Sequence, residues 1–194
     1  VIKNSTIGTT NATCAMYYVQ GATVNLNVSN DSVYNVTKNS ASTNFYFIYS
    51  GASLGNNGIA SINNNYIANN SVNAGTTVYG IFDNGSANAN QYFVSNNTIT
   101  DITTANSGIA YGIYTNTGNN RFTYNNKVNS IINSNASNTA RVHGLYINAG
   151  QFVYAYNNSI SNLRMPSGVD SNSVTGIFVN GPAGPANVGL YYNS

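Results

Sequence analysis

The hydrophobic and polar positions of this chain repeat along its whole length. A small or apolar residue, an aliphatic residue and an aromatic residue follow one another six times, with a step of 32 residues that is once 33. The six copies are Ala15-Met16-Tyr17, Phe47-Ile48-Tyr49, Gly80-Ile81-Phe82, Gly112-Ile113-Tyr114, Gly144-Leu145-Tyr146 and Gly176-Ile177-Phe178. So regular a period indicates a stack of equivalent units, which usually presents surfaces rather than one active-site pocket.

A second motif has the same period. The motif alternates apolar and variable positions, continues with two polar residues that are mostly Asn-Asn, and ends with an apolar residue after one further variable position. Its copies are residues 26–33, 60–67, 92–99, 121–128 and 153–160. The first Asn of the pair forms a constant column of Asn30, Asn64, Asn96, Asn125 and Asn157, and Asn4 and Asn193 are interpreted as partial copies. A further Asn column lies four residues after the small residue of the first motif, at Asn84, Asn116, Asn148 and Asn180.

The residue types within each unit favour strands. Helical repeats are rich in Ala, Leu, Glu, Lys and Arg, whereas these units hold Asn, Gly, Thr, Ser, Val, Ile and Tyr, most of which prefer strands or turns. Short alternating segments such as residues 99–102 are bounded by Asn and Gly turn signals. The sequence therefore predicts an all-β chain without helices.

Strands that recur at constant phase can stack in parallel, so that each unit forms one rung and adds about 4.8 Å of height. We predict a parallel β-helix (β-solenoid) of about six rungs, as a single domain over residues 1–194 that is either complete or a segment of a longer array. Two aliphatic columns are expected to fill the interior: Ile7, Val33, Ile67, Ile99, Val128 and Ile160, and Met16, Ile48, Ile81, Ile113, Leu145 and Ile177.

The Asn columns suit the corners of such a coil. Asn tolerates left-handed backbone geometry, and its side chain bonds to nearby backbone groups. Stacked amides can also donate and accept along the axis. We therefore predict an interior ladder at Asn30, Asn64, Asn96, Asn125 and Asn157, and a second ladder at Asn84, Asn116, Asn148 and Asn180.

Units of the form Gly-Ile-Tyr followed by Asn-Asn-x-Ile resemble the right-handed parallel β-helix repeats of pectate-lyase-like proteins and of many large secreted bacterial and archaeal surface proteins. The likeness extends from Asn4 to Ser194. It implies a right-handed coil, but that family includes lyases, hydrolases, phage tailspikes, adhesins and inert stalks. Its lyases need an Asp-rich calcium site and a basic proton acceptor, and no position here matches that set.

Composition narrows the function classes. Only 5% of the residues are charged and the net charge is +2, without a basic cluster that could bind nucleic acid by counterion release. No apolar run is long enough to span a membrane. The single Cys14 cannot form an internal disulfide and is interpreted as a small apolar filler in the column of Tyr46, Tyr79, Tyr111, His143 and Thr175.

Catalytic groups are scarce. Glycoside hydrolysis by the usual route needs two carboxylates roughly 5 to 10 Å apart, and the four acids Asp31, Asp83, Asp101 and Asp170 share no column. Each is interpreted as an Asn substitute or a loop residue, and His143 as structural. The sequence predicts a non-enzymatic protein with no cofactor and no metal.

The aromatic column is the strongest candidate for a functional surface. Tyr17, Tyr49, Phe82, Tyr114, Tyr146 and Phe178 each follow an aliphatic residue, and neighbouring strand residues point to opposite faces. If the aliphatic residues point inward, the rings form an outward stripe that could contact another rod or stack on sugar rings. The alternative is that the rings only stabilise the coil by stacking between rungs.

Asn-x-Ser/Thr sequons are numerous. We expect those in the corner column (Asn4, Asn30, Asn96, Asn157) to be too enclosed for glycosylation, which leaves Asn11 and Asn135 in variable loops as the candidate sites.

Neither end of the chain shows an atypical capping segment. Open strand edges pair with another copy or aggregate, and contacts that do not close into a ring produce a fibre. We therefore expect an extracellular or cell-surface structural protein, a filament, stalk or adhesin segment that self-associates head to tail. The alternative is a β-helix that binds or processes carbohydrate through the aromatic stripe.

Overall fold

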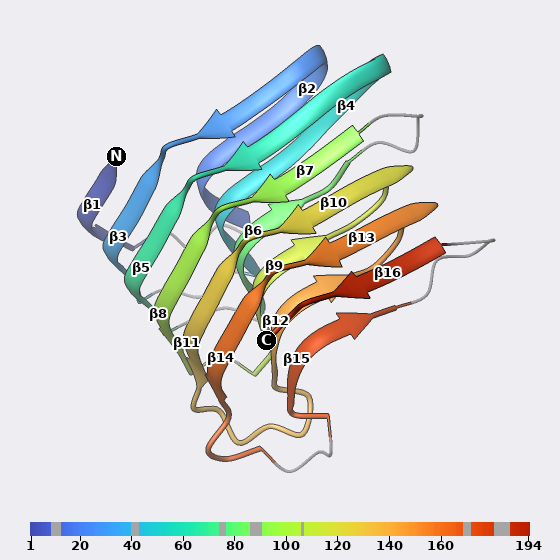
Figure 1. Ribbon diagram of the computed structural model, residues 1–194. Coiled ribbons are helices and arrows are strands. Elements are labelled where there is room, and N and C mark those ends of the chain that lie inside the picture. The colour runs from blue at the N-terminus through green and yellow to red at the C-terminus, as the bar shows by residue number, and fades with distance from the viewer. Residues whose placement is uncertain are drawn as a thin grey trace.

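The computed structural model describes residues 1–8, 13–39, 43–73, 77–85, 91–105, 107–168, 172–180 and 187–194, and the regular elements within them are β-strands. Parallel strands about 32 residues apart stack into a β-solenoid of about five turns, as Figure 1 shows. The predicted fold class is confirmed. The six predicted rungs correspond to the six stacked strands of one sheet, which bound about five turns.

Three faces surround the core. Face A is a six-stranded sheet of β1 (Ile2–Ile7), β3 (Ser32–Lys38), β5 (Tyr66–Val72), β8 (Thr98–Thr104), β11 (Lys127–Asn133) and β14 (Ser159–Arg164). Face B comprises β6 (Thr77–Asp83), β9 (Ile109–Thr115), β12 (Arg141–Ile147) and β15 (Val174–Val179), and face C comprises β7 (Gln91–Ser95), β10 (Asn120–Tyr124), β13 (Phe152–Tyr156) and β16 (Asn187–Tyr191). The long strands β2 (Thr13–Ser29) and β4 (Asn44–Asn63) join faces B and C, because residues 44–50 of β4 pair with β6 and residues 59–63 pair with β7.

The core is a set of aliphatic columns that point inward from all three faces. On face A, Val33, Ile67, Ile99 and Val128 are at most 1% exposed. On face B, Ile48, Ile81, Ile113 and Leu145 are equally buried. Burial of apolar side chains in every turn supplies the main stabilisation of the coil.

A column of glycines lets faces A and B approach closely. A Cβ on Gly112 would lie 2.5 Å from Val128 Cγ1 on face A and 2.6 Å from the carbonyl oxygen of Gly144 in the next turn. Gly144 is confined in the same way by Ile160 and Gly176. Packing therefore requires glycine at Gly80, Gly112 and Gly144. The same column holds the buried Phe47 in the preceding turn and is open at Gly176 in the last one.

Two columns of residues with left-handed backbone bend each turn. One forms the corner between faces C and A at Asn30, Asn64, Asn96, Asn125, Asn157 and Tyr192, and the other lies in the middle of face A at Asn4, Asn35, Asn69, Asp101, Ser130 and Asn162. All have φ between 50° and 59°. Asn and Asp are among the few non-glycine types that adopt this geometry readily, which explains their regular recurrence.

The register of the end turns differs from the prediction. Ile2 rather than Ile7 pairs with Val33, and Asn4 therefore belongs to the mid-face column beside Asn35. The predicted alignment of Met16 with Ile48 is also wrong, because β2 pairs Tyr17 with Ile48. The end units are shorter or longer than 32 residues, so extrapolation of the period placed their residues in the wrong columns.

Candidate functional site

The buried asparagine ladder lies one position after the predicted column, at Asn65, Asn97, Asn126, Asn158 and Asn193. The Nδ2 of Asn97 donates to Asn126 Oδ1 at 3.0 Å and to the Ile62 carbonyl at 2.9 Å. Asn126 Oδ1 also accepts the backbone N–H of Asn97 at 3.0 Å. The ladder thus satisfies backbone groups that the corner would otherwise leave unpaired.

The residues predicted to form the interior ladder do not point into the core. They are Asn30, Asn64, Asn96, Asn125 and Asn157. These residues adopt the left-handed geometry expected of them, but their side chains are exposed. Placing the interior ladder here was wrong because the left-handed residue turns its own side chain outward and the following residue turns inward. Asn193 belongs to the buried ladder, and Tyr192 takes the left-handed position beside Asn157.

The second predicted ladder is present after the face B strands. The side-chain amides of Asn116, Asn148 and Asn180 each donate to the amide oxygen of the preceding turn, at 2.7, 2.7 and 2.8 Å. The first acceptor is Asn84. The first two bonds are half-buried and the bond from Asn180 is exposed. Together they fix the start of the connection from face B to face C.

The aromatic stripe runs along the outer side of face B. Its rings are Tyr18, Tyr49, Phe82, Tyr114, Tyr146 and Phe178, stacked with centroids 4.6 to 5.4 Å apart. Tyr18 replaces the predicted Tyr17, because β2 pairs Tyr18 with Tyr49 at a spacing of 31 residues. Tyr17 instead packs partly against the core.

A second ring column stands beside the stripe. Tyr46, Tyr79, Tyr111 and His143 stack at 4.8, 5.0 and 5.4 Å and meet the stripe edge to face. Burial raises the pKa of Tyr46 to about 12. The backbone of Cys14 pairs with Phe45 rather than with this column, and its side chain lies outside the described residues.

His143, in this ring column, makes the stability of the folded protein depend on pH. It is 3% exposed, its Nδ1 has no hydrogen-bond partner in the described part of the chain, and burial together with nearby Arg141 lowers its pKa from 6.5 to about 4. Between these two values the unfolded state takes up a proton that the folded state does not, so stability is present above pH 6.5 and is lost as the pH falls.

We expect the urea midpoint of the protein to fall between pH 7 and pH 5, and His143→Tyr, which continues the tyrosine column, to remove that fall. His143 is the single histidine of the chain. Burial also raises the pKa of the Asp83 carboxyl, but that shift favours the folded state as the pH falls and is common to both proteins, so the difference between them isolates His143. Urea titrations at both pH values check the result, and the same change of midpoint in both proteins would contradict it.

Asp83 and Arg121 form a buried ion pair that joins two turns. Arg121 Nη1 lies 2.6 Å from Asp83 Oδ2, both side chains are at most 2% exposed, and the guanidinium lies 4.8 Å from the centroid of the Tyr92 ring. Burial raises the pKa of Asp83 against the opposing effect of Arg121. The interpretation of Asp83 as an Asn substitute was therefore wrong, since it is the counterion of an arginine that occupies an apolar column.

The other predicted acids and sequons lie in corners. The backbone N–H of Asp31 donates to Asn65, and Asp101 has the left-handed backbone of its column, so both replace Asn. Asp170 and Asn11 lie outside the described residues. Asn135 is half-buried and donates to the Ala105 carbonyl, whereas Asn96 and its corner equivalents are exposed, so the expectation that corner sequons are enclosed was wrong.

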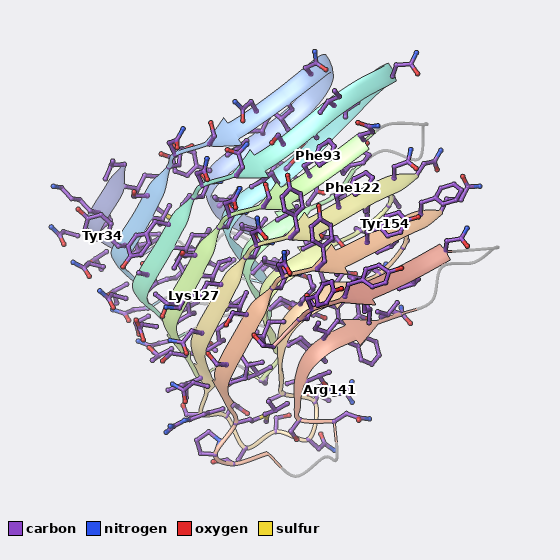
Figure 2. The ribbon with its side chains drawn as sticks, in the orientation of Figure 1. Tyr34, Phe93, Phe122, Lys127, Arg141 and Tyr154 are labelled. Carbon is purple, nitrogen blue, oxygen red and sulfur yellow. The ribbon has the colours of Figure 1, made fainter. Side chains whose placement is uncertain are left out.

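Face C carries a surface that the repeat motifs did not reveal. Its outer side has a ring column of Phe93, Phe122 and Tyr154, with centroids 5.1 and 5.6 Å apart, and Figure 2 shows these rings in a row on β7, β10 and β13. The beginnings of β7 and β10, together with residues 57–59 of β4, border an open groove of about 390 Å³, lined by Asn57, Gly58, Ile59, Gln91 and Asn120. Alternation of Gln91-Tyr92-Phe93 and Asn120-Arg121-Phe122 was the sequence signal that could have located this side.

The described ranges contain neither a metal cluster nor a membrane-spanning helix. No group of three or more His, Cys, Asp or Glu side chains there could hold a metal ion. The same part of the chain has no helix with the length and apolarity needed to cross a bilayer. The chain matches no protein-family model, no curated protein and no solved structure.

Proposed function

We propose that this chain is a structural, non-enzymatic part of an extracellular filament, stalk or adhesin, in which β-solenoid turns stack end to end. The observation that carries the proposal is the exposure of two core columns in the last turn. Val188 and Leu190 of β16 are 40% and 47% exposed, whereas Val153 and Ala155, at the same positions one turn earlier, are at most 1% exposed.

The other end carries the same two columns. Leu26, which is half-buried, and Val28, which is 6% exposed, belong to the columns of Val188 and Leu190, since β2, β4, β7, β10, β13 and β16 pair in consistent register. A second copy placed head to tail would therefore continue both the backbone hydrogen bonds and the apolar columns. Such a contact is heterologous and does not close, which produces a rod. The resemblance to secreted β-helix surface proteins supports an extracellular setting.

We expect this chain to form rods whose mean length increases with concentration, visible by sedimentation velocity and negative-stain imaging. Val188→Lys together with Leu190→Lys should block growth, because two charges would be buried at every junction. Tyr192→Lys is the matched control, since Tyr192 is 88% exposed and lies outside the core columns. A folded monomer at all concentrations would contradict the proposal.

A carbohydrate-binding β-helix is the second candidate function. On the face B stripe, neighbouring rings already stack on one another in every turn from Tyr18 to Phe178. A sugar can stack only on an uncovered ring face. The rings in the middle of this stripe have a neighbouring ring on both sides, so they are poorly suited to sugar binding. The stripe is better explained as a device that stabilises the coil, and loss of glycan binding in Tyr114→Ala and Tyr146→Ala would show otherwise.

A further inference from the structure

We propose that the outer side of face C binds a neutral oligosaccharide, with one sugar unit in the groove and the next on the ring of Phe93. The groove spans three strands, because Ile59, Gln91 and Asn120 are neighbours in register on β4, β7 and β10. Its volume of about 390 Å³ lies in the range of small-molecule sites. Its open shape suits an extended ligand.

The groove provides uncommitted amides. Among the described residues, most asparagine side chains that face a neighbouring turn are hydrogen-bonded in ladders, such as Asn97 to Asn126 and Asn148 to Asn116. The side chains of Asn57, Gln91 and Asn120 have no such bond within the described part of the protein. A primary amide presents both donors and an acceptor, which matches the hydroxyl groups of a sugar.

The ring column of face C ends beside these amides. Phe122 stacks between Phe93 and Tyr154, whereas the two end rings of the column each have a stacked ring on one side only. Phe93 pairs with Ser61 on β4 and Tyr154 with Gly189 on β16, and of these two ends only Phe93 lies on a strand that lines the groove. The side of Phe93 that faces Ser61 is therefore not covered by another ring. An uncovered aromatic face is the platform on which the apolar face of a sugar can pack.

Spacing and charge define the ligand class. Gln91 and Phe93 are two residues apart on the same side of β7, a distance of about 6.6 Å, which is close to the length of one sugar unit. No charged residue lines the groove, and the nearby Arg121 points inward and is neutralised by Asp83. The site therefore favours uncharged chains of two or more sugars over acidic ones.

The test uses the full chain and a panel of cellotetraose, maltotetraose, chitotetraose and mannotetraose. Saturation-transfer NMR and calorimetry should detect binding of at least one member. Gln91→Ala and Asn120→Ala should each weaken that affinity about threefold to tenfold through the loss of hydrogen bonds. Ser61→Tyr should abolish binding, because it extends the ring column over Phe93, while the thermal midpoint stays the same or rises.

Thr175→Tyr is the matched control. It adds a ring next to His143 on face B and should leave binding unchanged. The proposal is overturned if no tetrasaccharide binds, if Ser61→Tyr binds like the unsubstituted protein, or if Tyr146→Ala on face B is the variant that loses binding. Ser61 lies on β4, beside β2 of the first turn, but it shares the outward side of Phe93, whereas the filament contact uses the inward columns. Failure of this site and failure of filament formation are therefore separate results.

Discussion

Replacing Asn126 with leucine is expected to lower the free energy of unfolding by roughly 3 to 6 kcal/mol, since it leaves several buried polar groups without partners at about 1 to 3 kcal/mol each. The Asn126 oxygen accepts both the backbone and side-chain N–H of Asn97, and its Nδ2 donates to the Val94 carbonyl and to Asn158. Leucine has a similar volume but can form none of these bonds. Urea titration followed by circular dichroism measures the loss.

The adjacent Asn125 provides the control. Its side chain is exposed and its φ is 54°, a conformation that glycine adopts at no steric cost. Asn125→Gly should therefore change stability by less than about 1 kcal/mol. Equal effects at positions 125 and 126 would show that the ladder does not contribute as the hydrogen bonds indicate.

Gly112→Ala is the second substitution with a large expected effect, a destabilisation of about 3 kcal/mol at the upper end of overpacking costs. The added methyl group would lie 2.6 Å from the Gly144 carbonyl oxygen and 2.5 Å from Val128 Cγ1. A side chain could rotate away, but the carbonyl oxygen belongs to the backbone of the neighbouring strand. Relief of this contact would require β9 and β12, which are paired strands of face B, to shift apart.

Gly176→Ala tests the same column without the contact. No atom lies within 4 Å of a Cβ at this position, so alanine should be neutral or stabilise the chain slightly by restricting the unfolded state. The two variants are compared by urea midpoint. If the urea midpoint fell by a similar amount in both variants, the column would need glycine for its backbone conformation and not because of packing.

The sequence was sufficient for the fold because its information is repeated in every unit. The aliphatic columns, the left-handed Asn positions and the ladder at Asn84 to Asn180 follow from residue type at a constant period. Errors in the end turns arose where the period changes, as at Tyr17 and Asn193. The interior ladder was assigned to Asn125 and its equivalents instead of Asn126, because the period does not show which of two adjacent Asn side chains turns inward. In each case a shift of one residue reverses the side to which a side chain points.

The ion pair and the face C groove depend on contacts between columns, which periodicity within a column does not encode. Arg121 in an apolar column signalled a buried counterion, but the partner Asp83 lies 38 residues earlier on another face. The groove is bordered by the connection between faces B and C, and no repeat in the sequence predicts the shape of that connection.

The buried pair also bears on how such a coil reaches its native alignment during folding. Near-identical turns can in principle associate out of order, since a strand finds similar neighbours one turn too early or too late. Asp83 and Arg121 distinguish their turns from the others, and a slipped arrangement would leave each charge alone in an apolar interior, at a cost of about 3 to 5 kcal/mol. The ion pair thus disfavours misaligned intermediates in a chain whose uniformity would otherwise permit them.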